Sequence, residues 1–229
     1  MTDKITDWQT LNLQSLDIIL CSGSGKMSQQ IQWLQRLRGF VSPASDISHA
    51  AMIVRVPTVI AEVLDTSISP SGIYVNETTT LNNWPKPPKK GLQINDFEGW
   101  LENYNGKVWI RQVQSQVPPL NNQHIVRFIF DHLRDKDAQF YENGIPGLLE
   151  LFLCEIGWNK AVLQTAKLHC TEWISELLRQ FQVITNAYSG NRLPPVEWWP
   201  LVCKKNGTCR PSLLEQQALV KIGVPIRIK

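Results

Sequence analysis

The chain has 229 residues, of which 43% are hydrophobic, enough for one sizeable domain with a full apolar core. Its formal net charge of +3 is small and argues neither for nor against a nucleic-acid surface, and its basic residues are spread along the chain; we expect no nucleic-acid partner. Residues 1–10 lack the apolar segment of a secretory signal, and no apolar run approaches the roughly eighteen residues that span a bilayer, so we expect a cytoplasmic protein with no transmembrane segment.

The first predicted elements are a strand over residues 16–21, a loop over 22–25 and a helix over 26–37. The strand is a short apolar run, and the loop is Ser-Gly-Ser-Gly. The helix is indicated by apolar residues at helical spacing, which are Met27, Ile31, Leu34 and Leu37. The loop lacks the GxxxxGK[ST] spacing of a phosphate-binding loop, so no nucleotide cofactor is expected.

A hairpin is predicted next, with strands over residues 48–56 and 59–65 separated by Pro57-Thr58. Both strands are apolar on both faces, which is typical of central strands covered on each side. His49 and Glu62 are the exceptions inside these runs. If residues 55–58 form the loop, Val54 pairs with Val59 and Glu62 pairs with Ala51. His49 and Glu62 are then diagonal neighbours on one face of the sheet.

A histidine beside a carboxylate suits general base chemistry. A neutral imidazole is a usable base near pH 7, and a carboxylate on one ring nitrogen holds the ring in one tautomer and stabilises the imidazolium. The alternative is a buried hydrogen bond that only satisfies two polar groups of the sheet. The sequence alone leaves both interpretations of His49 and Glu62 open.

The middle of the chain mixes regular elements with a long excursion. Residues 67–92 are polar and proline-rich around a short strand at 73–76, which indicates a lid or a peripheral lobe. A helix over 94–104, a strand over 107–113 and a helix over 121–133 follow. Residues 144–157 are apolar and predict a buried helix or a lid, with an acyl-binding groove as the alternative to core packing.

Cys170 opens the next predicted helix, over residues 169–182. The apolar residues at helical spacing behind it are Trp173, Ile174, Leu177, Leu178 and Phe181. The free N–H groups and partial positive charge of a helix N-terminus stabilise a thiolate, which is the nucleophilic form of cysteine. The alternative is that Cys170 is a small buried hydrophobe.

The tail beyond residue 186 has a different composition. Trp198 and Trp199 are expected to pack against the sheet, with a helix over 213–222 and a closing strand over 224–228. Cys203 and Cys209 flank an Asn-Gly turn and either pair across a hairpin or remain free thiols. The chain has no CxxC motif and no histidines clustered near its cysteines, so no metal site is expected.

Four segments together carry a resemblance to a known family. They are Asp17-Ile18-Ile19-Leu20, Ser48-His49-Ala50-Ala51-Met52-Ile53, Ala61-Glu62-Val63 and His169-Cys170-Thr171-Glu172-Trp173-Ile174. In type, order and spacing they resemble the permuted papain-like cysteine hydrolases, in the YiiX-like branch of the NlpC-type superfamily. Two positions depart from the family pattern: Leu16 replaces the glycine usual before the aspartate, and Thr171 replaces the serine common after the cysteine.

The resemblance implies an α+β fold, the circularly permuted papain-like or NlpC-type fold, with a mostly antiparallel sheet packed against helices. Residues 1–185 would be the catalytic domain and 186–229 an extension packed on it. The implied roles are Cys170 as nucleophile, His49 as base and Glu62 as the residue that orients the base, without any cofactor.

The implied activity is hydrolysis of an amide bond, in a peptide or acyl-amide, through a thioester acyl-enzyme. A lipid-directed acyltransferase or lipase with the same triad, acting on a lipid-like substrate, is one alternative. A non-catalytic binding module that retains the fold is the other.

Overall fold

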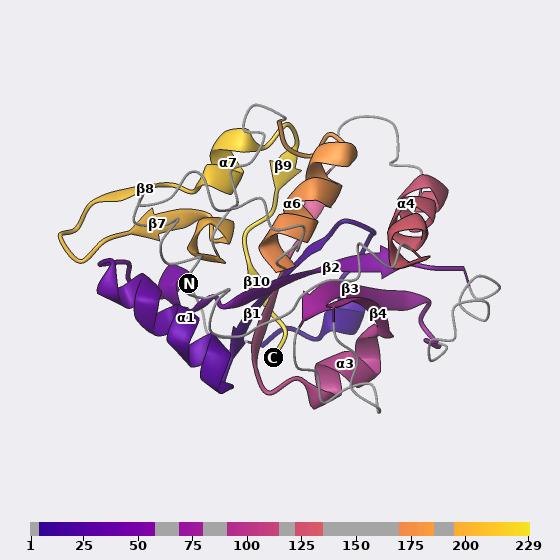
Figure 1. Ribbon diagram of the computed structural model, residues 1–229, viewed down its shortest axis with the longest axis horizontal. Helices are drawn as coiled ribbons and strands as arrows, with labels where there is room; N and C mark the ends of the chain where they lie inside the picture. The colour runs from indigo at the N-terminus through magenta and orange to yellow at the C-terminus, as the bar shows by residue number, and fades with distance from the viewer. Residues whose placement is uncertain (1–4, 58–68, 80–90, 115–121, 135–169, 186–194) are drawn as a thin grey trace.

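A six-stranded sheet forms the centre of the structure, a computed structural model that describes residues 5–57, 69–79, 91–114, 122–134, 170–185 and 195–229 (Figure 1). Its strands are β1 (Ile18–Gly23), β2 (His49–Arg55), β3 (Ile73–Thr79), β4 (Gly91–Asp96), β5 (Gly106–Arg111) and β10 (Ile226–Arg227). They lie in the order β10-β5-β1-β2-β3-β4, and each neighbouring pair is antiparallel. The predicted α+β class with a mostly antiparallel sheet is therefore confirmed.

Helices cover both faces of this sheet. The described α-helices are α1 (Lys26–Leu37), α3 (Phe97–Asn103), α4 (Asn122–Arg134), α6 (Cys170–Gln180) and α7 (Leu213–Gln217). Figure 1 shows α4 and α6 over one face and α3 over the other. The smaller elements are the 3-10 helices η1 (Trp8–Thr10), η2 (Ala44–Asp46) and η3 (Pro195–Trp198), and the strand pairs β6 (Val113–Gln114) with β9 (Lys221–Ile222) and β7 (Leu201–Cys203) with β8 (Cys209–Pro211).

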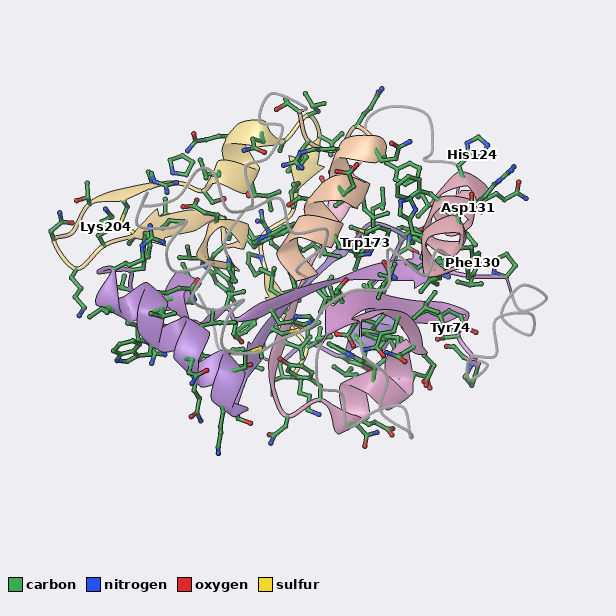
Figure 2. All side chains as sticks on the ribbon, viewed as in Figure 1. Tyr74, His124, Phe130, Asp131, Trp173 and Lys204 are labelled. Carbon is green, nitrogen blue, oxygen red and sulfur yellow. A yellow bond between two sulfur atoms is a disulfide. The ribbon has the colours of Figure 1, made fainter. Side chains whose placement is uncertain are left out.

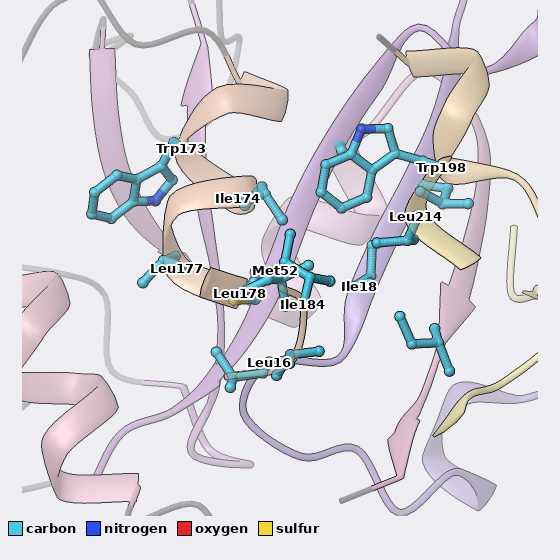
Figure 3. Close-up of a cluster of buried hydrophobic side chains, with 14 of the residues drawn as sticks. Leu16, Ile18, Met52, Trp173, Ile174, Leu177, Leu178, Ile184, Trp198 and Leu214 are labelled. Atoms are coloured by element: carbon cyan, nitrogen blue, oxygen red, sulfur yellow. The ribbon is translucent and has the colours of Figure 1, made fainter. Parts of the chain in front are cut away.

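The alternation of side chains along β2 divides the core into two clusters. Ala50, Met52 and Val54 belong to the cluster beneath α6, whereas Ala51 and Ile53 belong to the cluster beneath α3. Figure 3 shows the first cluster, in which the side chains of α6 meet those of the sheet. Because each face is covered, β2 is apolar on both faces, as its sequence predicts.

Most predicted elements are present with shifted ends. The helices over 26–37 and 121–133 correspond to α1 and α4. The helix predicted from residue 94 begins at Phe97, because residues 94–96 belong to β4 and the Asp96 carboxylate caps the helix by accepting from the Gly99 amide at 2.7 Å. The predicted strand 59–65 and the apolar segment 144–157 lie outside the described residues.

The helix α1 buries a different face from the predicted one. Leu37, placed on the apolar face by periodicity, is 62% exposed, while Gln32 and Gln35 are buried. The Gln35 amide donates to the carbonyl oxygens of Ser45 and Ile47, at 3.1 and 2.8 Å. Gln32 donates to the carbonyl oxygen of Gly23 at 3.1 Å. Carbonyl oxygens of the neighbouring segments thus accept hydrogen bonds from the amide nitrogens of a polar face that periodicity assigns to solvent, while the Gln35 side-chain oxygen is buried without a partner among the described residues.

The C-terminal segment is part of the same sheet through β10, which pairs with β5. Arg111 holds the C-terminal segment against the sheet. Its buried guanidinium donates to the carbonyl oxygens of Gly223 and Trp198, at 2.9 and 2.7 Å, and it also pairs with the carboxylate of Glu215. Burial lowers the pKa of Arg111, although Glu215 opposes that shift. As predicted, Trp199 packs against the sheet, with its ring centroid 5.6 Å from that of Trp109.

Cys203 and Cys209 form a disulfide across the β7–β8 hairpin, so the paired alternative is the one observed. Disulfides persist in oxidising compartments and are rare in the cytosol. The Cys203–Cys209 disulfide therefore gives no support to the expected cytoplasmic location. Within the described ranges no helix is long and apolar enough to cross a membrane.

Leu16 provides a test of backbone strain, because its φ of 75° lies in the left-handed region. Its side chain is buried, so Leu16→Ala should destabilise the protein by roughly 2–5 kcal/mol. Glycine adopts this φ freely, whereas a non-glycine residue there costs about 1 kcal/mol or more. Leu16→Gly should therefore be more stable than Leu16→Ala by about 1 kcal/mol in urea unfolding.

The matched control for this prediction is Leu20, which is equally buried on β1. At Leu20, which lies in a regular strand, glycine relieves no backbone strain and only adds conformational entropy to the unfolded chain. Leu20→Gly should therefore be less stable than Leu20→Ala by about 0.5–1 kcal/mol. If the glycine variant is less stable than the alanine variant at position 16 as well as at position 20, the proposed backbone strain at Leu16 is contradicted.

Asp17 makes stability depend on pH. Burial raises the pKa of its carboxyl from 3.8 to about 6, although it accepts from the Gln14 and Val113 amides, both at 2.8 Å. The folded chain therefore holds this proton more tightly than the unfolded chain, and the associated stability falls as pH rises from about 4 to above 6. A shift of about two units corresponds to about 3 kcal/mol.

The measurement is the free energy of unfolding of the natural chain minus that of Asp17→Asn, because other titrations cancel in the difference. This difference should fall by about 3 kcal/mol between about pH 4 and pH 7. A difference that stays constant or rises over that interval would show that burial does not control this group.

Candidate active site

His49 is the first residue of β2 and its side chain is only 15% exposed. Because residues alternate along a strand, His49 shares the face of Ala51 and Ile53, which is the face beneath α3. Its Nε2 atom lies 2.8 Å from Oε2 of Glu77 on β3. The structure therefore pairs the predicted base with a carboxylate of the neighbouring strand.

Glu77 is buried and its carboxylate is held from several sides. Besides the contact with His49, its Oε1 atom accepts from the Trp100 indole N–H at 3.1 Å and from the Gln93 side-chain amide at 3.4 Å. A buried carboxylate is costly unless such donors replace water. The donors from α3 and β4 leave Oε2 directed at the imidazole, so the carboxylate is positioned before any substrate arrives.

This geometry assigns the two ring nitrogens of His49. An ionised carboxylate only accepts hydrogen bonds, so Nε2 of His49 is the donor and Nδ1 of the neutral ring carries a lone pair. Glu77 also stabilises the charged ring once Nδ1 takes a proton. The pair can therefore act as an oriented general base whose proton acceptor is Nδ1.

The predicted orienting residue was Glu62, which lies outside the described residues. Val54 pairs with Tyr74 of β3, and Val59, its partner in the predicted register, also lies outside the described residues. The strand predicted at 73–76 ends one residue before Glu77, whereas β3 continues to Thr79. Ile73, Val75 and Glu77 alternate along the strand and therefore share one face of the sheet. This alternation in the sequence could have indicated a carboxylate on the face of His49.

Cys170 is the first residue of α6, as predicted. Its side chain lies outside the described part of the structure, so its contact with His49 remains a prediction. The rest of the helix is well placed: Ile174, Leu177 and Leu178 are buried against the sheet, and the Trp173 indole donates to Oδ1 of Asn76 at 2.6 Å.

The cysteine helix and the His49–Glu77 pair belong to opposite faces of the sheet. Trp173, in the first turn of α6, bonds to Asn76, the partner of Met52, and Leu178, in its last turn, lies beside Met52 in Figure 3.

The described residues contain no group of three or more His, Cys, Asp or Glu side chains that could hold a metal ion.

No protein-family model matches the chain, and no curated protein matches it either. Among solved structures, the metalloprotein yiiX from Escherichia coli O157:H7 is similar, with 14% sequence identity and a TM-score of 0.45 over 93% of this chain and 97% of that one. A likeness this distant assigns neither a family nor an activity.

The His49–Glu77 bond has a direct spectroscopic test. The Nε2–H proton of His49 should exchange slowly and appear far downfield in the proton NMR spectrum, because it is shared with a buried carboxylate. Glu77→Ala should remove the signal, and Glu62→Gln should preserve it. A spectrum in which neutral His49 carries its proton on Nδ1 would contradict the assignment.

Proposed function

We propose that the chain is a cysteine hydrolase of the permuted papain-like, YiiX-like type, acting on an amide bond. Cys170 is the nucleophile, His49 is the base and Glu77 orients the base. The observation that carries the proposal is the buried Glu77 carboxylate 2.8 Å from His49 Nε2, which leaves Nδ1 as proton acceptor. The start of α6 at Cys170 supports the nucleophile.

In the proposed reaction, the Cys170 thiol transfers its proton to Nδ1 of His49, and the thiolate attacks the substrate carbonyl carbon. The carbon–nitrogen bond then breaks, the leaving amine takes the proton from Nδ1, and a thioester remains on Cys170. Water gives a proton to Nδ1 and attacks the thioester, which releases the carboxylic acid and returns the proton to the sulfur. Glu77 stabilises the imidazolium in both halves.

A lipid-directed acyltransferase is the second candidate, because α1 exposes Trp33 and Leu37, two large apolar side chains one helical turn apart. It would use the same three residues, and a lipid hydroxyl or amine would replace water as the acceptor of the acyl group. The two candidates therefore differ in substrate and acceptor, not in the proposed nucleophile.

The test is alkylation by iodoacetamide near neutral pH, with the modified cysteine mapped by mass. Cys170 should react about tenfold faster in the natural chain than in His49→Ala, because the imidazole increases the thiolate fraction. Cys21 is buried and Cys203 and Cys209 are bonded to each other, so these cysteines provide internal controls.

A pair of carboxylate variants identifies the orienting residue. Glu77→Gln should slow the labelling of Cys170, whereas Glu62→Gln should leave the rate unchanged. Equal rates of Cys170 labelling in the natural chain and in His49→Ala would favour the non-catalytic module.

A further inference from the structure

The helix α1 exposes apolar side chains and buries polar ones. Trp33 is 59% exposed and Leu37 is 62% exposed, while Gln32 and Gln35 are buried. A surface helix usually places its apolar residues against the core, so this inversion needs a cause outside the fold. The side-chain amide nitrogens of both buried glutamines donate to neighbouring carbonyl oxygens, which holds this face of the helix against the fold.

The β7–β8 hairpin packs against the segment that follows α1. The Val41 amide donates to the Cys203 carbonyl oxygen at 3.0 Å, and the Lys205 amide donates to the Gly39 carbonyl oxygen at 2.8 Å, so the hairpin lies against the end of α1 (Figure 1). Leu201 of the hairpin is exposed, as are Lys204 and Lys205. Figure 2 shows Lys204 at the outer end of the hairpin.

This part of the chain is basic. Residues 18–45 and 198–214 contain no aspartate or glutamate. Their basic side chains are Lys26, Arg36, Arg38, Lys204, Lys205 and Arg210. Arg36 pairs with Asp46 at 2.6 Å, and Arg210 pairs with the buried Glu197. Arg38 and Lys204 stack on the ring of Phe40, which places two cations between the helix and the hairpin. The exposed apolar residues thus lie within a positive field.

We propose that Trp33, Leu37, Leu201, Lys204 and Lys205, the α1–hairpin surface, dock the protein on an anionic phospholipid membrane. Tryptophan and leucine suit the boundary between headgroups and acyl chains, and lysines beside them attract anionic headgroups. The charge complementarity favours anionic lipid over a neutral apolar partner. A recess of about 210 Å³ on the same hairpin is lined in part by Phe40 and Lys204.

The helix α1 joins the surface to the strand beside the candidate active site. It begins at Lys26, soon after β1, whose Cys21 pairs with His49, and it ends at Leu37 beside the hairpin. The docking proposal does not depend on catalysis, because membrane binding is measured without a substrate.

The experiment is flotation of the full chain with vesicles of phosphatidylcholine alone or with about one quarter phosphatidylserine. The natural chain should float with the anionic vesicles only, and binding should weaken as salt is added. The double variant Trp33→Ser, Leu37→Ser should reduce binding about tenfold or more, because the apolar contact is lost. Lys204→Glu with Lys205→Glu should also reduce binding about tenfold or more.

The matched control is Leu219→Ser with Val224→Ser, which removes two comparably exposed apolar residues from the C-terminal segment and should leave binding unchanged. Circular dichroism verifies that each variant is folded. The proposal is overturned if the natural chain fails to float with anionic vesicles at low salt, or if the control loses binding equally. The proposal is also overturned if the natural chain does not bind vesicles but forms a dimer in solution that the double variant Trp33→Ser, Leu37→Ser dissociates. In that case the surface binds a second copy of the chain. Cys170 labelling is measured separately, so either proposal can fail alone.

Discussion

The bond between the Glu77 carboxylate and the His49 imidazole is the interaction on which the candidate site depends. It joins β2 to β3, and donors from Trp100 and Gln93 hold it in place. Removing the carboxylate would leave a buried indole N–H without an acceptor, at a cost of about 1–3 kcal/mol. A buried arrangement of this kind keeps the imidazole in one orientation, which is the property that a general base requires.

The strand β3 relates the histidine to the cysteine helix. Asn76 and Glu77 are adjacent, so their side chains point to opposite faces of the sheet. Asn76 accepts from Trp173 of α6, and Glu77 accepts from Trp100 of α3 and contacts His49. Two neighbouring residues thus tie the helix that begins at Cys170 and the base to the same short stretch of strand. In the proposed mechanism, this stretch sets the distance between nucleophile and base.

The docking surface bears on which molecule accepts the acyl group. A hydrolase that uses water needs no membrane beside its active site, whereas an acyltransferase that uses a lipid does. The exposed Trp33 and Leu37, set among basic side chains, provide a physical reason to favour a lipid-facing orientation. The disulfide of the β7–β8 hairpin stiffens the part of this surface that carries Lys204 and Lys205.

The sequence by itself determined the elements whose signal is local. Helical spacing located α1, α4 and α6, the apolar run with His49 located β2, and the Asn-Gly turn between two cysteines located the disulfide hairpin. Only the tertiary structure placed Glu77 at His49, because strand register depends on distant segments: Val54 pairs with Tyr74, which puts Glu77 of β3 on the face of His49. It also decided which face of α1 is buried, since the carbonyl oxygens that accept from the Gln35 side-chain amide belong to residues 45 and 47, outside the helix, and helical periodicity takes no account of them.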